Sequence, residues 1–363
     1  MTRKLEKLAF AAALLPFIMT LLNLGRLRRL PGRSWRGPVS VLIPARDEEE
    51  TIRAAIETVL ASKRVELELI VLDDHSSDRT LDVLRACDDP RLRVLQAPDL
   101  PEGWCGKTHA CALLAEAARN ELMLFVDADV RLRPDALGRL SAVMFERPDV
   151  AFFSGVPRQI TRTFLEWLLL PFIHVLLLGY LPMVFDSGQK PALAAACGQL
   201  VLVRRSAYHS SGGHAAIRNR LHDGLALARQ FRTCGFKTML FDASDSGSCR
   251  MCPRAADVWN GRWKNATEGM ATPRGLPVWT VLLGGAQIRP FLLPTTQVSR
   301  LAAGMTLLTR GLISYRFRQG WGTVVLAPLG TALLLMIQWQ ALVGGYLGHA
   351  PRWRGRSYPR RSV

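Results

Sequence analysis

Acidic residues are scarce in this sequence. Its 363 residues include 30 Asp and Glu against 47 Lys and Arg, which leaves a formal net charge of +17. Nucleic-acid binding is one source of such an excess, but here the arginines gather beside apolar runs. One cluster follows the first apolar run and another follows the last: Arg26, Arg28, Arg29, Arg33 and Arg36, then Arg352, Arg354, Arg356, Arg360 and Arg361. This pattern fits anionic lipid headgroups better than a nucleic-acid groove, so we predict a lipid bilayer as partner and no nucleic acid.

Cysteines are few and irregularly spaced. There are seven cysteines, an odd number, and their spacing is irregular. Both features argue against a disulfide framework and favour free thiols in a reducing compartment. Cys249 and Cys252 make a single CxxC pair. A second CxxC or a pair of histidines is missing nearby, so a structural zinc site is disfavoured.

Internal repeats and low-complexity linkers are also missing, and the hydrophobic content of 49% is high for a purely soluble protein. Leu8 to Gly25 carries no charge and is long enough to span a membrane once. A cleaved signal peptide is the alternative, but no small-residue cleavage site precedes the arginines. Because the stronger basic flank follows this segment, we predict a bacterial-type inner-membrane protein in which the domain after the segment is cytoplasmic.

From Val39 to about Val150, short apolar runs alternate with helical stretches. This alternation predicts an α/β domain with a mostly parallel, Rossmann-like sheet covered on both faces. Ligands bind such sheets at the carboxyl ends of the strands. Three predicted strands end in polar clusters, at residues 45–48, 73–74 and 127–129.

The sequence LMLFVDADVRLRP places Asp127 and Asp129 at the end of an apolar strand. Positions i and i+2 of a strand face the same way, and two like charges that close repel unless a cation lies beside them. Oxygen ligands of this kind suit a divalent cation, which would bridge to a diphosphate. A helix cap is the alternative explanation of these aspartates.

Two further residues, Lys107 and Asp223, are candidates for the site. Lys107, after Gly106, stands at a predicted helix start, where backbone amides and a lysine hold anions, although the Walker A spacing is missing. Asp223 is a candidate general base, since transfer of a group to an alcohol needs a base near the attacking oxygen. Its alternative role is that of a solvated residue in the first turn of a helix.

Taken together, four segments resemble family 2 glycosyltransferases of the GT-A fold: VSVLIPARDEEETI, VLDDHSSDRT, FVDADVRLRPDAL and RLHDGLALARQFRTCGFKT. The resemblance covers about Val39 to Ala271. PEGWCGKTHA, GQLVLVRRSAYHSSGGH and the terminal WRGRSYP are similar to membrane-attached members that glycosylate isoprenoid lipids, of the hopanoid-associated and carotenoid types.

The resemblance implies roles for individual residues. On the nucleotide-sugar side it implies Pro44, Ala45, Glu48, Asp73, Asp74, Lys107, Asp127 and Asp129. Asp129, with Asp127, would hold the diphosphate and a Mg²⁺ or Mn²⁺ ion. Asp223 matches the catalytic aspartate. On the acceptor or diphosphate side it implies Gln199, His214, His222, Arg262 and Trp263.

The sequence departs from the family pattern at two positions. His222 stands where the family has glutamate before the catalytic aspartate, which changes the surroundings of Asp223. Trp259 stands at the first position of the Q/RxxRW motif, so Arg262 could be structural instead of contacting the acceptor. His214, which follows two glycines, belongs either to an acceptor-side loop or to an ordinary loop.

We therefore predict a membrane-attached inverting glycosyltransferase that uses a nucleotide-diphosphate sugar, expected to be UDP-linked, and a membrane lipid acceptor. Expected boundaries are a membrane anchor and basic flank at 1–37, a GT-A domain at 38–275, and membrane segments with a basic tail at 276–363. The apolar segment 164–185 is expected to lie in the membrane interface without crossing it. A polysaccharide-forming glycosyltransferase and a non-catalytic membrane scaffold remain the alternatives.

Overall fold

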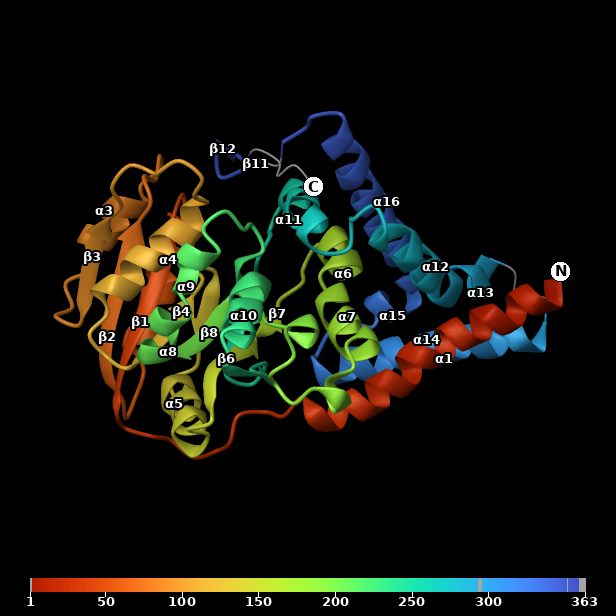
Figure 1. Cartoon of the computed structure of the whole chain (residues 1–363), viewed down its shortest axis with the longest axis horizontal. Coiled ribbons are helices and arrows are strands. Elements are labelled where there is room, and N and C mark those ends of the chain that lie inside the picture. The colour runs from red at the N-terminus through yellow and green to blue at the C-terminus, as the bar shows by residue number, and fades with distance from the viewer. Residues whose placement is uncertain (1, 293–295, 351, 359–363) are drawn as a thin grey trace. The chain divides into compact units, whose positions relative to one another are not determined.

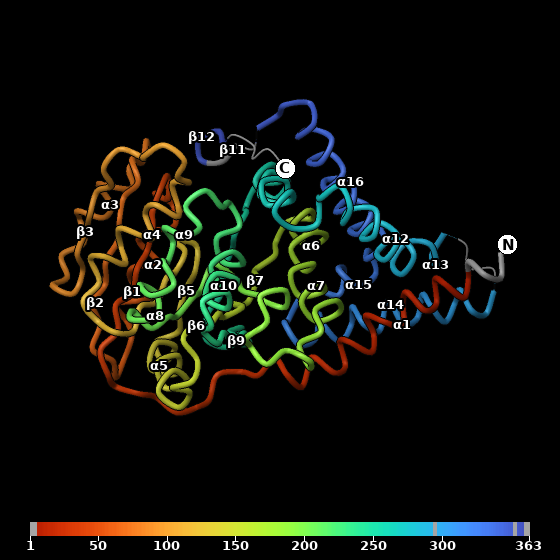
Figure 2. Tube along the Cα trace, viewed as in Figure 1, coloured from red at the N-terminus to blue at the C-terminus, as the bar shows by residue number. Residues whose placement is uncertain are grey.

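The computed structural model describes residues 2–292, 296–350 and 352–358 (Figure 1). The chain forms two compact units. The α/β unit contains residues 27–158 and 186–249, and the helical unit contains residues 1–26, 159–185 and 250–363. Figure 2 follows the chain from the N-terminal helix into the α/β unit, which it leaves twice before the C-terminal helices.

A seven-stranded sheet forms the centre of the α/β unit, in the order β3-β2-β1-β4-β8-β6-β9. The strands are β1 (Pro38–Ala45), β2 (Glu66–Asp73), β3 (Leu92–Gln96), β4 (Leu122–Val126), β6 (Val150–Val156), β8 (Leu200–Arg204) and β9 (Lys237–Asp242). Neighbours pair in parallel except around β8, which is antiparallel to both β4 and β6. The mostly parallel sheet predicted from the alternating pattern is confirmed.

The central strands of the sheet are mostly buried, whereas the edge strand β3 is half-buried, and apolar side chains from both strands and helices make up the core. One cluster joins Leu42 of β1, Phe125 of β4 and Phe152 of β6 to Leu114 and Phe231. The helices of this unit are α2 (Ile52–Leu60), α3 (Thr80–Arg85), α4 (Gly106–Ala117), α5 (Ala136–Glu146), α8 (Arg205–Ser210), α9 (Gly213–Ala216) and α10 (Asp223–Thr233), with a 3₁₀ turn η2 (Pro191–Leu193). Leu114 lies on α4 and Phe231 on α10, so these two helices cover the same face of the sheet.

The carboxyl ends of β1, β2 and β4 lie at one edge of the sheet. Ala45 pairs with Asp73 in the parallel register of β1 and β2. Asp127 follows β4, and its backbone N–H donates to the carbonyl of Gln199, 3.1 Å away, at the start of β8. Beyond it, the short strands β5 (Val130–Leu132) and β10 (Gly247–Cys249) pair antiparallel. The strand order and register therefore bring the predicted polar clusters to one edge.

The acids at 48–50 precede the helix that follows β1. Helix α2 starts at Ile52 and its first turn contains no acidic residue. Instead, the Glu48 carboxylate accepts a hydrogen bond from the Thr51 hydroxyl at 2.6 Å. These acids therefore belong to the loop that leaves the sheet edge.

The helical unit is built from three separated parts of the chain. It contains α1 (Thr2–Arg26), α6 (Phe164–Leu169), α7 (Phe172–Tyr180), η1 (Met183–Phe185), α11 (Ala255–Lys264), η3 (Ala266–Glu268), α12 (Gly275–Gln287), α13 (Arg289–Leu292), α14 (Gln297–Arg316), α15 (Gly322–Val325), α16 (Ala327–Tyr346) and the short pair β11 (Arg352–Trp353) and β12 (Arg356–Ser357). Helix α1 packs against α7, α12 and α14. Residues 6–26 of α1 and the whole of α16 are long and apolar enough to cross a membrane.

This division differs from the boundaries expected from the sequence. Segments 159–185 and 250–275, which we assigned to the GT-A domain, cluster with the terminal helices instead. The strand β7 (Arg158–Gln159) lies where the chain passes from one unit to the other. In the predicted basic tail, Arg360 and Arg361 lie outside the described residues, as do Pro351 and Pro359 of the flanking sequence.

Candidate active site

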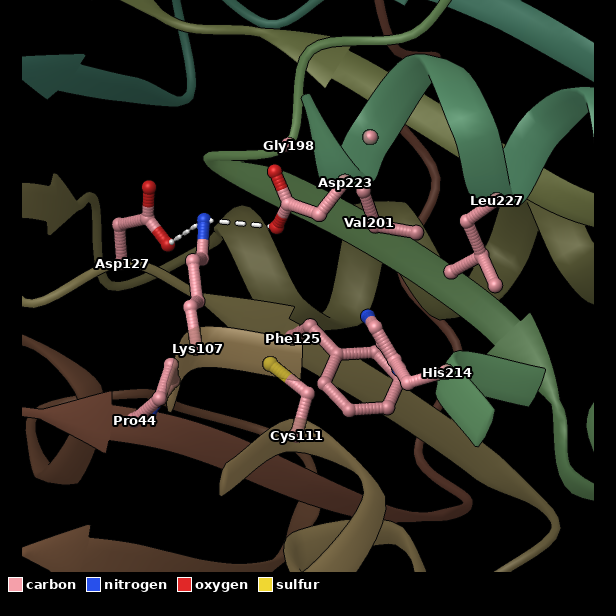
Figure 3. A pocket seen from close by; sticks show the side chains of 11 residues that line it. Pro44, Lys107, Cys111, Phe125, Asp127, Gly198, Val201, His214, Asp223 and Leu227 are labelled. Carbon is pink, nitrogen blue, oxygen red and sulfur yellow. Dashed lines mark ion pairs between the residues drawn. The ribbon is translucent and has the colours of Figure 1, made fainter. Parts of the chain in front are cut away.

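A lysine joins the two acidic motifs of the α/β unit. The ammonium nitrogen of Lys107 lies 2.8 Å from Oδ1 of Asp127 and 2.9 Å from Oδ2 of Asp223. Figure 3 shows the lysine pointing between the two carboxylates, with Cys111, Phe125 and His214 beneath them. Although burial opposes its charge, the carboxylates of Asp127 and Asp223 raise the pKa of Lys107 well above its usual value. Lys107 therefore stays charged and separates two anions that would otherwise repel.

These side chains line one pocket of the α/β unit. Its lining residues are Pro44, Lys107, Cys111, Phe125, Asp127, Gly198, Val201, His214, Asp223, Gly224 and Leu227. They come from the end of β1, the start of α4, the end of β4, the start of β8, α9 and α10. Four residues proposed from separate motifs, Pro44, Lys107, Asp127 and Asp223, thus meet in one pocket.

Asp223 owes its place to two glycines. It is the first residue of α10, and the backbone of Gly224 passes close to Gly198, just before β8. A Cβ on Gly224 would lie 2.5 Å from the Gly198 nitrogen, which is closer than real side chains approach backbone. Only glycine lets the start of α10 come this near to the sheet edge.

Asp127 and Asp129 lie in a turn and not on a strand. Strand β4 ends at Val126, and the Val130 N–H donates to the Asp127 carbonyl at 3.0 Å, closing the turn before β5. The alternation of strand side chains therefore does not explain why the two carboxylates are close. The negative charge of Asp127 nonetheless reaches Asp129 and contributes to raising the pKa of Asp129.

Asp129 is half-buried and lies near other acids. Burial, followed by the negative charges of Asp127 and Glu48, raises the pKa of Asp129 to about 7. One of its oxygens, Oδ1, is buried and has no hydrogen-bond partner within the described part of the chain. The Cys249 thiol lies nearby, since Cys249 pairs with Val130 in the β10–β5 register. Asp129 thus carries a buried acceptor that lacks a cation or donor.

The residues fit a divalent cation. Carboxylate oxygens are the ligands that Mg²⁺ and Mn²⁺ prefer, and an unsatisfied buried carboxylate oxygen is costly unless something binds it. Across residues 2–292, 296–350 and 352–358, no group of three or more His, Cys, Asp or Glu side chains converges as a metal cage. Asp129 and Asp127 would therefore hold the ion together with oxygens of a ligand, as Mg²⁺ bound to nucleotides is usually held.

The turns after β1 and β2 are tied together on the predicted nucleotide side. The Ser77 N–H donates to Oδ1 of Asp47 at 2.7 Å, and the Asp47 N–H donates to the Ser76 hydroxyl at 3.0 Å. Asp47 has a positive φ of 52° and His75 one of 56°, conformations that need such support in residues other than glycine. These bonds hold the turns in one conformation before any ligand arrives.

Asp73 and Asp74 are buried at the end of β2, each with 3% of its surface exposed. The Ser76 N–H donates to one Asp73 oxygen at 3.4 Å, whereas the other, Oδ1, has no partner within the described chain. Asp74 is held through its backbone, since its N–H donates to the Ala45 carbonyl. Asp73 is thus the better placed of the two to accept a hydrogen bond from a ligand.

The acceptor-side candidates divide between the two units. His214 is buried in the pocket, where its Nδ1 lies 2.8 Å from the Tyr208 hydroxyl and burial lowers its pKa to about 4. Gln199 is buried behind Asp127, and His222 precedes α10. Trp263 instead belongs to the helical unit, where it packs against a small apolar cluster.

Arg262 also lies in the helical unit. Its guanidinium donates to the carbonyls of Leu169 and Leu170, at 2.9 Å and 3.2 Å, and so satisfies the end of α6. This contact fits the structural alternative that the altered Q/RxxRW motif left open.

Two features of the pocket were missed by the sequence interpretation. The approach of Gly198 to Gly224 joins positions 26 residues apart and has no local signal in the sequence. Cys249 was weighed only as half of a CxxC pair, yet its pairing with Val130 in the β10–β5 register brings it next to the turn that contains Asp129. A cysteine has no recognisable role until its strand partner is known.

Comparisons with known proteins agree with this geometry. Residues 40–211 match the model of a family described as Glycosyl transferase family 2. A 4,4'-diaponeurosporenoate glycosyltransferase of Staphylococcus aureus (strain USA300) is 27% identical over 239 residues, which are 65% of this chain and 62% of that protein. The chain thus aligns with less than two thirds of the relative's length.

A solved structure shares the fold. Mannosyltransferase PcManGT from Pyrobaculum calidifontis, in complex with GDP-Man and Mn²⁺, has a TM-score of 0.56 at 18% identity, over 93% of this chain and 99% of that one. At this identity the likeness concerns the fold alone, and it confirms the predicted GT-A class. The chain is thus similar to glycosyl transferase family 2 over residues 40–211, and its fold is of the GT-A class.

Proposed function

We propose that this chain is an inverting glycosyltransferase that moves a sugar from a nucleotide-diphosphate sugar to a membrane lipid. The observation that carries the proposal is the position of Lys107 between Asp127 and Asp223. It places Asp127, a candidate residue for binding the diphosphate, and Asp223, the candidate base, in one pocket. The match to that family and the carotenoid-type relative support the same reaction class and acceptor class.

The reaction is a single displacement at the anomeric carbon. Asp223 takes the proton from the acceptor hydroxyl as that oxygen bonds to the anomeric carbon. The bond from this carbon to the diphosphate breaks, and its electron pair stays with the diphosphate. A carboxylate acceptor reacts in the same way without giving up a proton. Attack opposite to the leaving group inverts the configuration.

Lys107 and the DxD turn act on the leaving group. Lys107 offers its charge to the diphosphate as the donor enters, and this exchange frees Asp223 to act as a base. Asp127 and Asp129 would hold Mg²⁺ or Mn²⁺, and a bound cation supplies charge screening for the departing diphosphate. The carboxylate oxygen of Asp129 that lacks a partner supports this assignment.

The nucleotide and the membrane are the finer parts of the proposal. Asp73 can accept from a ring N–H of uracil or of guanine, so its chemistry alone favours neither base. A UDP-linked sugar is our expected donor on the sequence resemblance, whereas the structural relative was solved with GDP-Man. The apolar helices α1 and α16 support attachment to a bilayer, with the α/β unit on the cytoplasmic side.

The test is sugar transfer by the purified full-length chain in lipid nanodiscs. Radiolabelled UDP- and GDP-sugars are offered with isoprenoid alcohols and acids, and lipid products are identified by mass spectrometry. We expect a glycolipid that forms only with a divalent cation, and none with Asp129→Ala. Polymeric product would indicate the polysaccharide alternative. A wild-type protein that binds no sugar nucleotide would contradict the proposal in favour of a scaffold.

A further inference from the structure

The sequence YHSSGGH, residues 208–214, runs from α8 into α9 and has no role in the proposed reaction. Its first and last residues, Tyr208 and His214, are both buried, at 4% and 3% exposed. The Tyr208 hydroxyl meets His214 twice. It accepts a hydrogen bond from the His214 backbone N–H at 3.0 Å, and it lies 2.8 Å from Nδ1 of the His214 ring. Two bonds to one residue fix both the backbone and the imidazole of His214.

A glycine and a phenylalanine complete the support of this histidine. Gly213 has a positive φ of 48°, and a Cβ at that position would overlap the Tyr208 ring. The tyrosine can therefore reach His214 only because residue 213 has no side chain. On the sheet, Phe125 of β4 packs edge-on against the imidazole, with the ring centroids 4.9 Å apart. The His214 ring is thus held by contacts from α8 and from β4.

The available donors determine which ring nitrogen of His214 carries the proton. A tyrosine hydroxyl has one hydrogen, and the Tyr208 oxygen already accepts the His214 N–H. Its own hydrogen therefore goes to Nδ1, 2.8 Å away; a proton on Nδ1 would leave that hydroxyl hydrogen buried without a partner, which is costly. Burial lowers the pKa of His214 to about 4, so the ring is neutral at pH 7. The single ring proton then lies on Nε2.

The outer end of the His214 ring faces the candidate active site. His214 lines the same pocket as Lys107, Asp127 and Asp223. Figure 3 shows its ring beneath the two ion pairs, pointing up into the pocket. In the proposed displacement the diphosphate lies beside Asp127 and the base is Asp223, so the sugar lies between them. A neutral N–H in this place suits an uncharged oxygen, whereas the diphosphate is met by charged partners.

We propose that His214 is a sugar-binding residue: its Nε2–H donates a hydrogen bond to a hydroxyl group of the donor sugar, and Tyr208 is the positioning residue that keeps the proton on Nε2. The sugar takes its place as Lys107 leaves Asp223 for the diphosphate. The inference rests on the proposed function in so far as the sugar of the donor occupies this pocket.

Two substitutions of His214 separate the roles of its ring nitrogens. An asparagine amide reaches only as far as Nδ1 and can still pair with Tyr208, whereas a glutamine amide reaches the place of Nε2 and can still donate to a sugar. A residue that is merely structural should tolerate asparagine better than glutamine. A sugar-binding residue should show the opposite order.

Calorimetric titration of the purified full-length chain in lipid nanodiscs measures these affinities. The probes are UDP-glucose, UDP-N-acetylglucosamine and GDP-mannose, with UDP and GDP as the matched ligands that lack a sugar, all with Mg²⁺. We expect His214→Asn to weaken the sugar nucleotide that wild type binds by about 10-fold, the size of one neutral hydrogen bond. Its affinity for UDP or GDP should stay within about 3-fold of wild type. His214→Gln should bind the sugar nucleotide to within about 3-fold.

His209→Asn is the matched control, because His209 belongs to the same sequence but is exposed and pairs with Glu116 outside the pocket. It should bind every probe as wild type does. An equal loss of affinity for sugar nucleotide and nucleoside diphosphate in His214→Asn would make His214 structural and overturn the proposal.

The tautomer is measured separately by nitrogen-15 nuclear magnetic resonance of the chain labelled at histidine. The His214 signals are those that disappear in His214→Gln. We expect a protonated Nε2 in wild type, a mixture of tautomers in Tyr208→Phe, and an Nε2 signal that shifts with the sugar nucleotide more than with UDP or GDP. A protonated Nδ1 in wild type would overturn the role of Tyr208. If His214→Asn does not fold, the shift of the Nε2 signal decides the sugar contact.

The outcome is separable from that of the proposed function. A chain whose affinity for a sugar nucleotide depends on His214 in this way, yet that transfers no sugar, would support this inference and contradict the transferase. Sugar transfer by a chain in which His214→Asn binds every probe as wild type does would do the reverse. A wild type that binds none of the probes would overturn both.

Discussion

At the scale of single residues, Asp223 cannot accept a proton while it is fully engaged with Lys107. The ammonium lies 2.9 Å from its Oδ2 and 2.8 Å from Asp127, so one lysine neutralises part of both charges. A diphosphate that enters the pocket gives Lys107 a stronger anionic partner. Binding of the donor would thus prepare the base for the acceptor that follows.

Replacement of Asp223 by Asn tests the base directly. The side chain keeps its size and loses its basicity, so we expect donor binding to persist and turnover with an alcohol acceptor to fall about 10²-fold or more. A carboxylic acid acceptor has already lost its proton at pH 7 and should be affected less. Donor affinity is measured by calorimetry and turnover by product formation. A parallel loss of binding and turnover would make Asp223 a ligand or structural residue.

The sequence revealed some site residues and not others, for a physical reason. Asp127, Lys107 and Asp223 stand at a strand end or a helix start, where pattern alone places them at the binding edge of a parallel sheet. Gly198 gains its role from a close approach across the fold, to Gly224, which lies 26 residues further along the chain. No local pattern encodes such contacts.

At the scale of elements, the start of α10 depends on the closeness of Gly224 to Gly198. A Cβ on residue 224 would lie 2.6 Å from the Gly198 Cα, and backbone at that place has little freedom to move. We expect Gly224→Ala to lower the free energy of unfolding by about 1–3 kcal/mol. Turnover should fall by about 10²-fold, because the displaced helix carries Asp223 with it.

The matched control is Gly32→Ala, where an added Cβ meets no atom within 4 Å. Thermal unfolding and turnover are measured on both variants in the same detergent. Full activity of Gly224→Ala would show that α10 tolerates the shift, and that the close approach does not set the position of Asp223.

The strand β2 is fastened at its amino-terminal end by Glu68. Its carboxylate accepts from the Ser40 hydroxyl at 2.6 Å, the Arg119 N–H at 3.1 Å and the Arg93 guanidinium at 2.9 Å. Burial opposes the charge, but these donors together lower the pKa of Glu68 below its usual 4.5. The folded protein therefore binds this proton less readily than the unfolded chain does.

The sign of the pH effect follows from this lowered pKa. Stability from Glu68 is fully present above about pH 4.5 and is lost as the pH falls through the folded-state pKa. Glu68→Gln should cost about 1–3 kcal/mol at pH 7, and the difference from wild type should shrink only as the pH falls below about 4.5. Thermal unfolding at several pH values measures it, with Glu66→Gln as an exposed control on the same strand. A difference that stays constant with pH would contradict the ionic origin.

The elements that sequence patterns identified are the ones with local order. The alternation of strands and helices up to β4 predicted a parallel sheet, and those strands do pair in parallel. The insertion of β8 between β4 and β6, antiparallel to both, follows from pairing across the chain and has no periodic signal. It nevertheless brings Gln199 and Gly198 to the edge of the site.

At the scale of the whole molecule, three separated segments share one helical unit. The Asn23 amide donates to the carbonyls of Leu178 and Leu181, at 2.9 Å and 2.6 Å, and so joins α1 to the end of α7. Composition predicted an apolar anchor at the N-terminus. It did not predict that a side chain of this helix would donate hydrogen bonds to the carbonyls at the end of a helix more than 150 residues away. The apolar helix α1 therefore also packs against α7 within the helical unit.

The parts of the α/β unit that precede residue 159 and follow residue 185 must lie on the same side of a membrane. The sheet with Asp127 precedes the segment 159–185 and Asp223 follows it, yet Lys107 contacts both carboxylates. A single crossing would separate them. Helix α7 has 9 residues and spans about 14 Å, less than half of a hydrocarbon core of roughly 30 Å, and Pro171 separates it from α6. We therefore predict that the segment lies in the interface, where it would meet a lipid acceptor.

Accessibility of engineered cysteines in sealed inverted and right-side-out vesicles measures this topology. Arg162→Cys and Ser187→Cys place exposed thiols before and after the segment, in a background where the exposed Cys234 and the half-buried Cys87 are replaced. Both positions should react with a membrane-impermeant maleimide from the cytoplasmic face only, because an interfacial segment returns the chain to the side it left. Reaction from opposite faces would require a crossing between Asp127 and Asp223, and a pocket that Lys107 closes between them could not then form in the membrane-bound protein.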